Sequence, residues 1–163
     1  MPEEAQGRTG IPSERRLKLE RPRDELGRPQ PWEAENRLVL EDFDSLPMEE
    51  NHELGRKHFN AGRFFPAHEA WETAWKQARK TDEAEFFKGL SQLGAGYVHL
   101  LRGNAHGAIT LLRRASRRVR EYPSPHREVR TQEVSDAAEA DAEAVERGEL
   151  TPGPDAAARP PRV

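Results

Sequence analysis

The sequence predicts an all-α protein, a small helical bundle of two stacked αα-hairpins with a weaker C-terminal helix and disordered ends. Three observations predict this fold. Apolar residues recur at helical spacing between residues 45 and 148, and prolines and glycines fall where these periodic segments begin and end. A shift of 41 positions also brings one half of this region into register with the other, as in stacked repeats.

The first two predicted helices form the first hairpin. The first helix follows Ser45 and Pro47 and ends near Gly62, which fits the tendency of proline to begin helices and of glycine to follow them. The second helix begins at Pro66, again a proline in the first turn. Its apolar stripe comprises Ala67, Trp71, Ala74 and Ala78, and Trp75 lies beside it.

The next two predicted helices form the second hairpin. Residues 85–102 carry one full charge between Phe86 and Leu101, that of Lys88, so we expect this helix to be central and the most buried. The fourth helix covers residues 105–122 and buries Ala108, Leu112, Ala115 and Val119. A weaker fifth helix is predicted over residues 132–147, where Gly148 ends it.

An internal repeat supports the two hairpins. The shift of 41 positions aligns identical residues in five pairs, which are Gly55 with Gly96, His58 with His99, Gly62 with Gly103, Ala67 with Ala108, and Ala74 with Ala115. One of these glycine pairs falls at the two predicted turns. We therefore expect each hairpin to turn at its own glycine and to bury one face against the other hairpin.

The ends of the chain have a different composition. Residues 1–44 are rich in Pro, Arg and Glu, and residues 149–163 have four prolines and no periodicity, so we expect a largely disordered arm and a disordered tail around a helical domain at residues 45–148. Trp32 and a short apolar patch that includes Leu38 and Phe43 are the candidate docking points of the arm.

Composition narrows the classes of function. The 163 residues include no cysteine, which excludes disulfides and thiolate chemistry. No run approaches the roughly 18 apolar residues of a membrane span, and residues 1–16 lack the apolar core of a signal peptide, so we expect a cytoplasmic protein without membrane contact. A net charge of −3 gives no global indication of nucleic-acid binding.

Two short motifs lie on the second and third predicted helices. They are Ala67-His68-Glu69-Ala70-Trp71-Glu72 and Gly89-Leu90-Ser91-Gln92, and the stretch from His99 to Asn104 follows them. Over residues 46–122 the chain resembles domain-of-unknown-function family 309, small helical proteins with an Ala-His-Glu-x-x-Glu and a Gly-Leu-x-Gln motif. The resemblance implies an all-α fold and a candidate site, and it implies neither a reaction nor a cofactor.

The candidate site is a polar pocket between the second and third predicted helices. His68 and Glu72 are four residues apart and share a helix face, with Glu69 beside them. Lys88, Gln92 and His99 form a polar stripe on the third helix, which would meet them if that helix is central. The leading hypothesis is a non-catalytic module that binds a small ligand or a peptide there, although His68 and Glu72 are also explained as a structural pair.

A metal-assisted hydrolase is the first alternative. In that interpretation Glu69 or Glu72 acts as a base or ligand, and His68, Glu72 and His99 are the candidate metal ligands. The motif lacks the second histidine of the His-Glu-x-x-His zinc helix, which argues against it. His58 lies on an apolar face and is predicted to be a structural histidine.

Nucleic-acid binding is the second alternative. Five arginines lie on the fourth predicted helix, namely Arg113, Arg114, Arg117, Arg118 and Arg120. The acidic residues of the following segment, from Glu133 to Glu146, offer an intramolecular charge match instead, so nucleic acid is not favoured. The sequence predicts neither the ligand nor the oligomeric state.

Overall fold

The computed structural model of the protein describes residues 21–163. In this part of the chain a short 3-10 helix precedes five α-helices, and no β-strand is present. The elements are η1 (Phe43–Ser45), α3 (Met48–Asn60), α4 (Phe64–Gln77), α5 (Ala84–Leu101), α6 (Ala105–Val119) and α7 (Thr131–Glu146). The all-α prediction is confirmed. None of the helices in residues 21–163 has the length and apolar composition needed to cross a lipid bilayer.

Each predicted helix is present, with small differences at the ends. α4 begins at Phe64, two residues before Pro66, because a proline within the first turn has no intrahelical N–H bond to lose. α6 ends at Val119 instead of residue 122, shortly before Pro123. A residue that precedes proline is disfavoured in the helical conformation, which explains the earlier end.

The two hairpins turn in the same way. Gly62 and Gly103 both have a left-handed φ, of 80° and 86°. After each glycine the backbone N–H points back into the helix: Arg63 N–H donates to the His58 carbonyl and Asn104 N–H to the His99 carbonyl, both at 2.8 Å. These are the bonds of a glycine-capped helix end, so the repeat seen in the sequence is a repeat of turn geometry.

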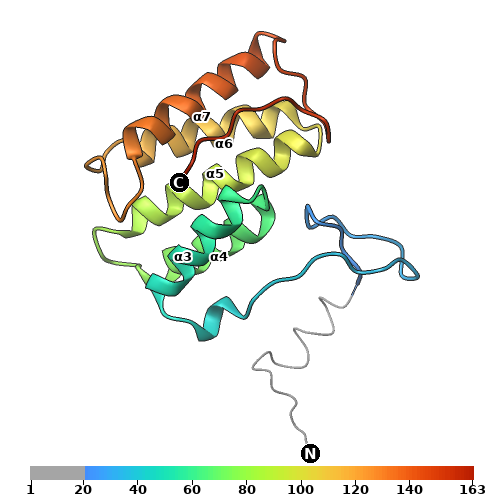
Figure 1. Cartoon of the computed structure of the whole chain (residues 1–163), viewed down its shortest axis with the longest axis horizontal. Coiled ribbons are helices and arrows are strands. Elements are labelled where there is room, and N and C mark those ends of the chain that lie inside the picture. The colour runs from blue at the N-terminus through green and yellow to red at the C-terminus, as the bar shows by residue number, and fades with distance from the viewer. Residues whose placement is uncertain (1–20) are drawn as a thin grey trace, which may run out of the picture.

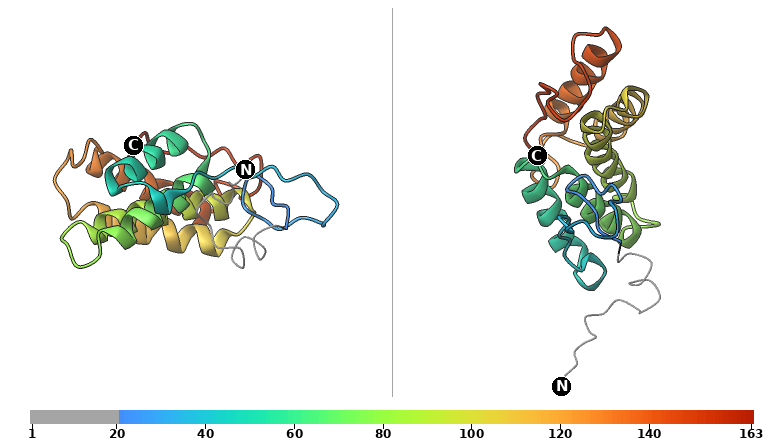
Figure 2. Two further views of the ribbon diagram at one scale, coloured as in Figure 1. Left: turned by 90° about the horizontal axis from the view of Figure 1, so that it is seen from below. Right: turned by 90° about the vertical axis from the view of Figure 1, so that its right-hand side faces the viewer.

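α5 lies between α4 and α6 at the centre of the molecule (Figure 1). α3 packs on α4 and α7 packs on α6, so that α7 and the α3–α4 pair occupy opposite ends (Figure 2). Two glycines of α5 permit close approach. A Cβ atom on Gly94 would lie 3.0 Å from the His68 backbone nitrogen, and one on Gly96 would lie 2.7 Å from the Leu112 side chain.

The core runs along the buried face of α5. Phe86, Phe87, Leu90 and Leu93 are fully buried together with Trp71 of α4. On the same helix Tyr97 is buried, and its hydroxyl donates to Asp141 Oδ2 of α7 at 2.6 Å. Burial raises the pKa of Tyr97, and the Asp141 carboxylate adds to this. The bond therefore holds α7 against the central helix.

Both ends of the helical domain continue into segments that contact it. Residues 1–20 of the predicted arm lie outside the described residues. The segment 149–163, predicted as a tail, runs back over α5 and α6 towards α3 (Figure 1). Its Val163 is buried and exchanges two hydrogen bonds with Asn60, at 2.8 and 2.9 Å, while Gly153 N–H donates to the Leu100 carbonyl at 2.8 Å.

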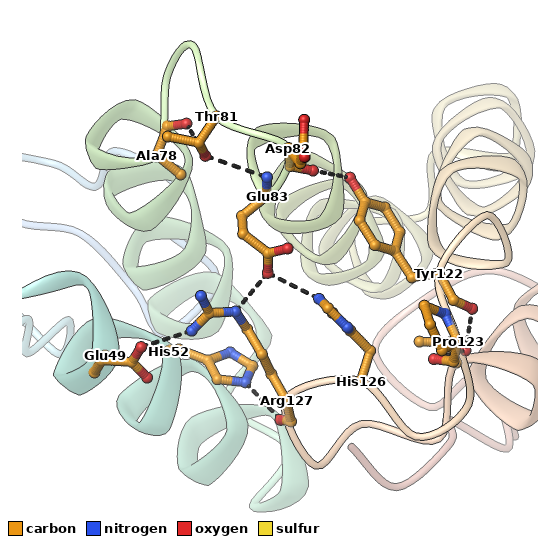
Figure 3. Close-up of polar contacts among 11 residues, drawn as sticks. Glu49, His52, Ala78, Thr81, Asp82, Glu83, Tyr122, Pro123, His126 and Arg127 are labelled. Carbon is orange, nitrogen blue, oxygen red and sulfur yellow. Dashed lines mark hydrogen bonds and ion pairs between the residues drawn. The ribbon is translucent and has the colours of Figure 1, made fainter.

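The loop between α6 and α7 is held by a polar network around Glu83 (Figure 3). Glu83 Oε1 accepts hydrogen bonds from His126 Nε2 at 2.8 Å and from Arg127 Nε at 2.5 Å. Arg127 also donates to Glu49 of α3 at 2.7 Å. The network thus joins the start of α5, the loop and α3.

His52 of α3 completes this connection. Trp71 Nε1–H donates to His52 Nδ1 at 3.1 Å, so the proton of the neutral ring is on Nε2, which donates to the Arg127 carbonyl at 3.0 Å. Burial lowers the pKa of His52, and the cationic side chains of Arg56 and Arg127 lower it further. A proton added to Nδ1 would break the bond from Trp71.

We predict that the protein loses stability on acidification through His52. The unfolded chain binds a proton near pH 6.5, whereas the folded chain binds it only at a lower pH. The free energy of unfolding therefore decreases as the pH is lowered below about 6.5, by at most about 1.4 kcal/mol per pH unit. Urea unfolding between pH 5 and 8 measures this slope. His52→Gln should flatten it and the exposed control His106→Gln should not; equal slopes in all three proteins would contradict the assignment.

Candidate functional site

His68 of α4 is held against α5 by Ser91. The close contact at Gly94 brings its ring within 3.0 Å of the Ser91 carbonyl and 2.9 Å of the Ser91 hydroxyl, both measured from Nδ1. The Ser91 hydroxyl also donates to the His68 carbonyl at 3.2 Å. Because a carbonyl oxygen can only accept, the proton of the ring is on Nδ1.

The other ring nitrogen of His68 faces two carboxylates. Nε2 lies 3.3 Å from Glu72 Oε1 and 3.7 Å from Glu69 Oε2, and one ligand atom from each of the three residues lies within 4.8 Å of the others. Burial raises the pKa of Glu69, and the nearby Glu72 carboxylate raises it further, against the opposing effect of His68. Lys76 Nζ is 3.5 Å from Glu72. A proton or a metal ion at Nε2 would satisfy all three groups.

A cavity of about 120 Å³ is also lined by His68. Its lining residues come from α4, from α5 and from the residue after α5, and they are Phe65, His68, Ala95, Val98, His99 and Arg102. None of the six is acidic. The cavity therefore combines an apolar wall with an arginine and two imidazole rings.

His99 presents a donor nitrogen at this cavity. The Asn104 side chain caps α6, since its Oδ1 accepts from Gly107 N–H at 3.0 Å, and this bond fixes the orientation of the amide. Asn104 Nδ2 therefore donates to His99 Nδ1 at 2.9 Å, and the ring proton is on Nε2. Burial lowers the pKa of His99, as do the nearby Arg102 and His68, which favours the neutral ring.

Arg102 supplies a second donor. Its Nη2 donates to the Leu26 carbonyl of the arm, while its Nε is shielded from solvent and has no hydrogen-bond partner among the described residues. Burial lowers the pKa of Arg102. No carboxylate in residues 21–163 lies within ion-pair distance of this guanidinium.

The arm reaches the cavity through a tight loop. Asp24 is buried and organises this loop, because its Oδ1 accepts from Leu26 N–H at 3.0 Å and from Arg28 N–H at 2.9 Å. Gly27 has φ 80°, and a Cβ atom there would lie 2.5 Å from the Phe65 ring. Residues 23–29, hereafter the arm loop, thus pack on one lining residue and bond to another.

Lys88 and Gln92 do not line the cavity. The ammonium group of Lys88 lies 5.3 Å from the centre of the Trp75 ring on α4, a cation–π distance. Gln92 Oε1 accepts from Arg118 Nη1 of α6 at 3.0 Å. Both side chains are half-buried, so the polar stripe of α5 contacts both neighbouring helices, and of its three members His99 alone meets His68 at the cavity.

The arginines of α6 are divided between two situations. Arg113 bonds to Glu139 at 3.1 Å and to Glu146 at 2.8 Å, which confirms the predicted charge match with α7. Arg118 bonds to Glu85 of α5 at 2.9 Å. The remaining three are exposed and have no hydrogen-bond or ion-pair partner in residues 21–163, namely Arg114, Arg117 and Arg120.

One comparison with known proteins bears on this region. Residues 53–111 match the family model described as "Domain of unknown function (DUF309)". The match spans 59 of the 163 residues, so one segment of the chain is similar to this family. The resemblance drawn from the sequence is thereby confirmed, and no curated protein or solved structure matched the chain.

The DUF309 segment contains every residue that lines the cavity, whereas the arm loop lies outside it. Sequence reasoning found His68 and His99 but missed Phe65, Ser91 and Arg102. The spacing of Arg102 could have indicated it, since Arg102 follows His99 by three residues and so lies about one helical turn away. Ser91 had none, because a serine inside an apolar helix is explained equally well by packing.

We predict that the Gly27–Phe65 contact keeps the arm loop in place. Gly27→Ala places a methyl group into the Phe65 ring, and Phe65→Ala removes the ring without changing the loop. Both should speed amide hydrogen exchange of residues 24–30 at least tenfold, which corresponds to about 1.4 kcal/mol. Gly148→Ala is the matched control, since Gly148 has φ 77° and open space around its Cα. Unchanged exchange in Phe65→Ala would mean that the loop is held without α4.

Proposed function

We propose that this domain binds a small polar ligand in the cavity between α4 and α5, without a chemical step. The observation that carries the proposal is a cavity lined both by His99, whose Nε2–H has no acceptor in residues 21–163, and by Arg102, which has no carboxylate there within ion-pair distance. A ligand with an acceptor group would supply the missing partner of His99.

The size of the cavity limits the ligand. At about 120 Å³ it is smaller than the roughly 300–1,000 Å³ of sites for drug-sized molecules. A group of a few non-hydrogen atoms fits it, either as a whole small molecule or as the end of a larger one. Phe65, Ala95 and Val98 offer this group an apolar wall, while His99 and Arg102 offer it donors.

The lining residues favour binding over catalysis. No serine, threonine, lysine or carboxylate is among the six, so the cavity has no nucleophile apart from its two imidazole rings. The hydrogen bond from Asn104 holds His99 as a donor, and the bond to Ser91 holds Nδ1 of His68 as a donor. The lone pair that remains, on Nε2 of His68, faces the Glu69 and Glu72 carboxylates.

A screen of small polar compounds, neutral and charged, against the ¹⁵N-labelled full chain tests this function. We expect at least one compound to shift the amide signals of Ala95, Val98 and His99. His99→Phe, which removes Nε2–H, should weaken that compound at least tenfold, while His106→Phe at an exposed position of α6 should leave it unchanged. Compounds that bind only elsewhere, or none that bind, would refute the proposal.

A metal site is a second candidate, favoured by one specific observation. The bond from Nδ1–H to the Ser91 carbonyl leaves the Nε2 lone pair of His68 directed at Glu69 and Glu72. Metal-binding histidines are oriented in this way, by a hydrogen bond from the ring nitrogen that does not bind the metal. One imidazole and two carboxylates suit a divalent ion such as Zn²⁺ or Mn²⁺, with coordination positions left for water or a ligand.

Calorimetric titration of chelator-treated protein with Zn²⁺ and with Mn²⁺ tests this second candidate. We expect one ion per chain, and a loss of up to about 10-fold in affinity when Ser91→Ala removes the hydroxyl 2.9 Å from Nδ1, since the backbone carbonyl that accepts from Nδ1–H remains. Glu72→Gln should weaken binding at least as much, whereas Glu121→Gln, an exposed carboxylate outside the cluster, should not. Affinity that is unaffected by Glu72→Gln would exclude this site.

A further inference from the structure

The two repeat-related histidines hold the same tautomer. In the first hairpin Arg63 Nε–H donates to His58 Nδ1 at 2.9 Å, and in the second Asn104 Nδ2–H donates to His99 Nδ1 at 2.9 Å. Arg63 and Asn104 occupy equivalent positions under the shift of 41 residues. Each ring therefore has its proton on Nε2, and each is fixed by the residue that follows its turn.

The two Nε2–H groups differ in what they meet. That of His58 lies 3.0 and 3.1 Å from the two carboxylate oxygens of Glu41, so one imidazole donor faces both oxygens of a carboxylate. That of His99 has no acceptor among the described residues, and its ring lines the cavity. The first hairpin thus shows which group this arrangement binds.

We infer that the cavity beside His99 takes a carboxylate group, which accepts a hydrogen bond from Nε2–H of His99 beside the cationic guanidinium of Arg102. This inference rests on the proposed ligand-binding function and names the chemical class of the ligand. Arg102 occupies the position that Ala61 has in the first hairpin, so the second hairpin adds a cation where the first has none. Charge-assisted hydrogen bonds to a carboxylate are roughly twice as strong as neutral ones.

The surroundings agree with a carboxylate on a small body. No lining residue carries a negative charge that would repel it, and the nearest acid of the arm loop, Asp24, is already paired with Arg28 at 2.7 Å. The arm loop bonds to Arg102 through the neutral Leu26 carbonyl, so the charge of that guanidinium has no carboxylate partner in residues 21–163. The carboxylate can belong to a free small acid or to the C-terminus of a peptide.

Acetate and acetamide test the inference, because they have nearly the same shape and differ in charge. Each is titrated into the ¹⁵N-labelled full chain at constant ionic strength. We expect acetate to shift the signals of His99 and Arg102 and to bind at least tenfold more tightly than acetamide. Acetate should also raise the midpoint of the His99 titration, since an anion stabilises the imidazolium form. The exposed His106 serves as the internal control and should not respond.

Triglycine and its C-terminal amide distinguish the two sources of the carboxylate. If triglycine binds more tightly than acetate and its C-terminal amide does not, the ligand is a peptide C-terminus. If acetate binds and triglycine does not, the ligand is a small acid. The carboxylate inference would be wrong if acetamide bound as tightly as acetate, or if neutral compounds of the screen bound in the cavity and acetate did not. Either result would leave the proposal of a ligand-binding cavity in place. If nothing binds there, both proposals fail. The acetate-to-acetamide ratio needs no variant, and His99→Phe should abolish it.

Discussion

The close contact of α4 with α5 at Gly94 is the constraint on which the site depends. A Cβ atom at this position would lie 3.0 Å from the His68 backbone nitrogen, so a side chain there would require the two helices to shift apart by a few tenths of an ångström. The approach brings the Ser91 carbonyl to His68, which sets the tautomer of the ring and therefore the direction of its lone pair. The metal candidate and one wall of the cavity follow from this single contact between backbones.

The two hairpins share one arrangement of turn and histidine. In the first hairpin this arrangement forms an intramolecular bond, and in the second we propose that it binds a ligand. In both hairpins a glycine turn returns the chain so that the following residue donates to the histidine. His58 then completes a bond to Glu41 in the segment before α3, which ties the arm to the bundle. His99 has the same donor without such a partner. A duplicated structural element can acquire a ligand in this way when the intramolecular acceptor is missing from one copy.

Helical periodicity predicted the elements and their order, and it could not predict which neighbour each polar side chain would contact. The charge-poor face of α5 indicated its central position, and the spacing of His68 and Glu72 placed them together. Lys88 and Gln92 follow the same stripe, yet one bends towards α4 and the other towards α6. The direction of a long side chain depends on the partners on both sides, and a single helix does not specify them.

The contacts of the arm loop and of Val163 could not be predicted from the sequence, for a related reason. Segments rich in proline and charge have little apolar surface, and composition alone predicts that they stay unpacked. The buried Asp24 carboxylate organises this segment through hydrogen bonds to its own backbone. The contact of Gly27 with the Phe65 ring then fixes the segment against α4. Neither feature has a periodic signal.

His68 also connects the two candidate functions, because one ring belongs to both. Its Nε2 faces Glu69 and Glu72, and its ring lines the cavity that His99 and Arg102 share. A divalent ion at Nε2 would add positive charge beside that cavity and would strengthen the attraction of an anionic ligand. Linkage requires the reverse as well: an anion in the cavity must strengthen the binding of the ion by the same factor. The two occupants would then be one cooperative site, divided by a single imidazole ring.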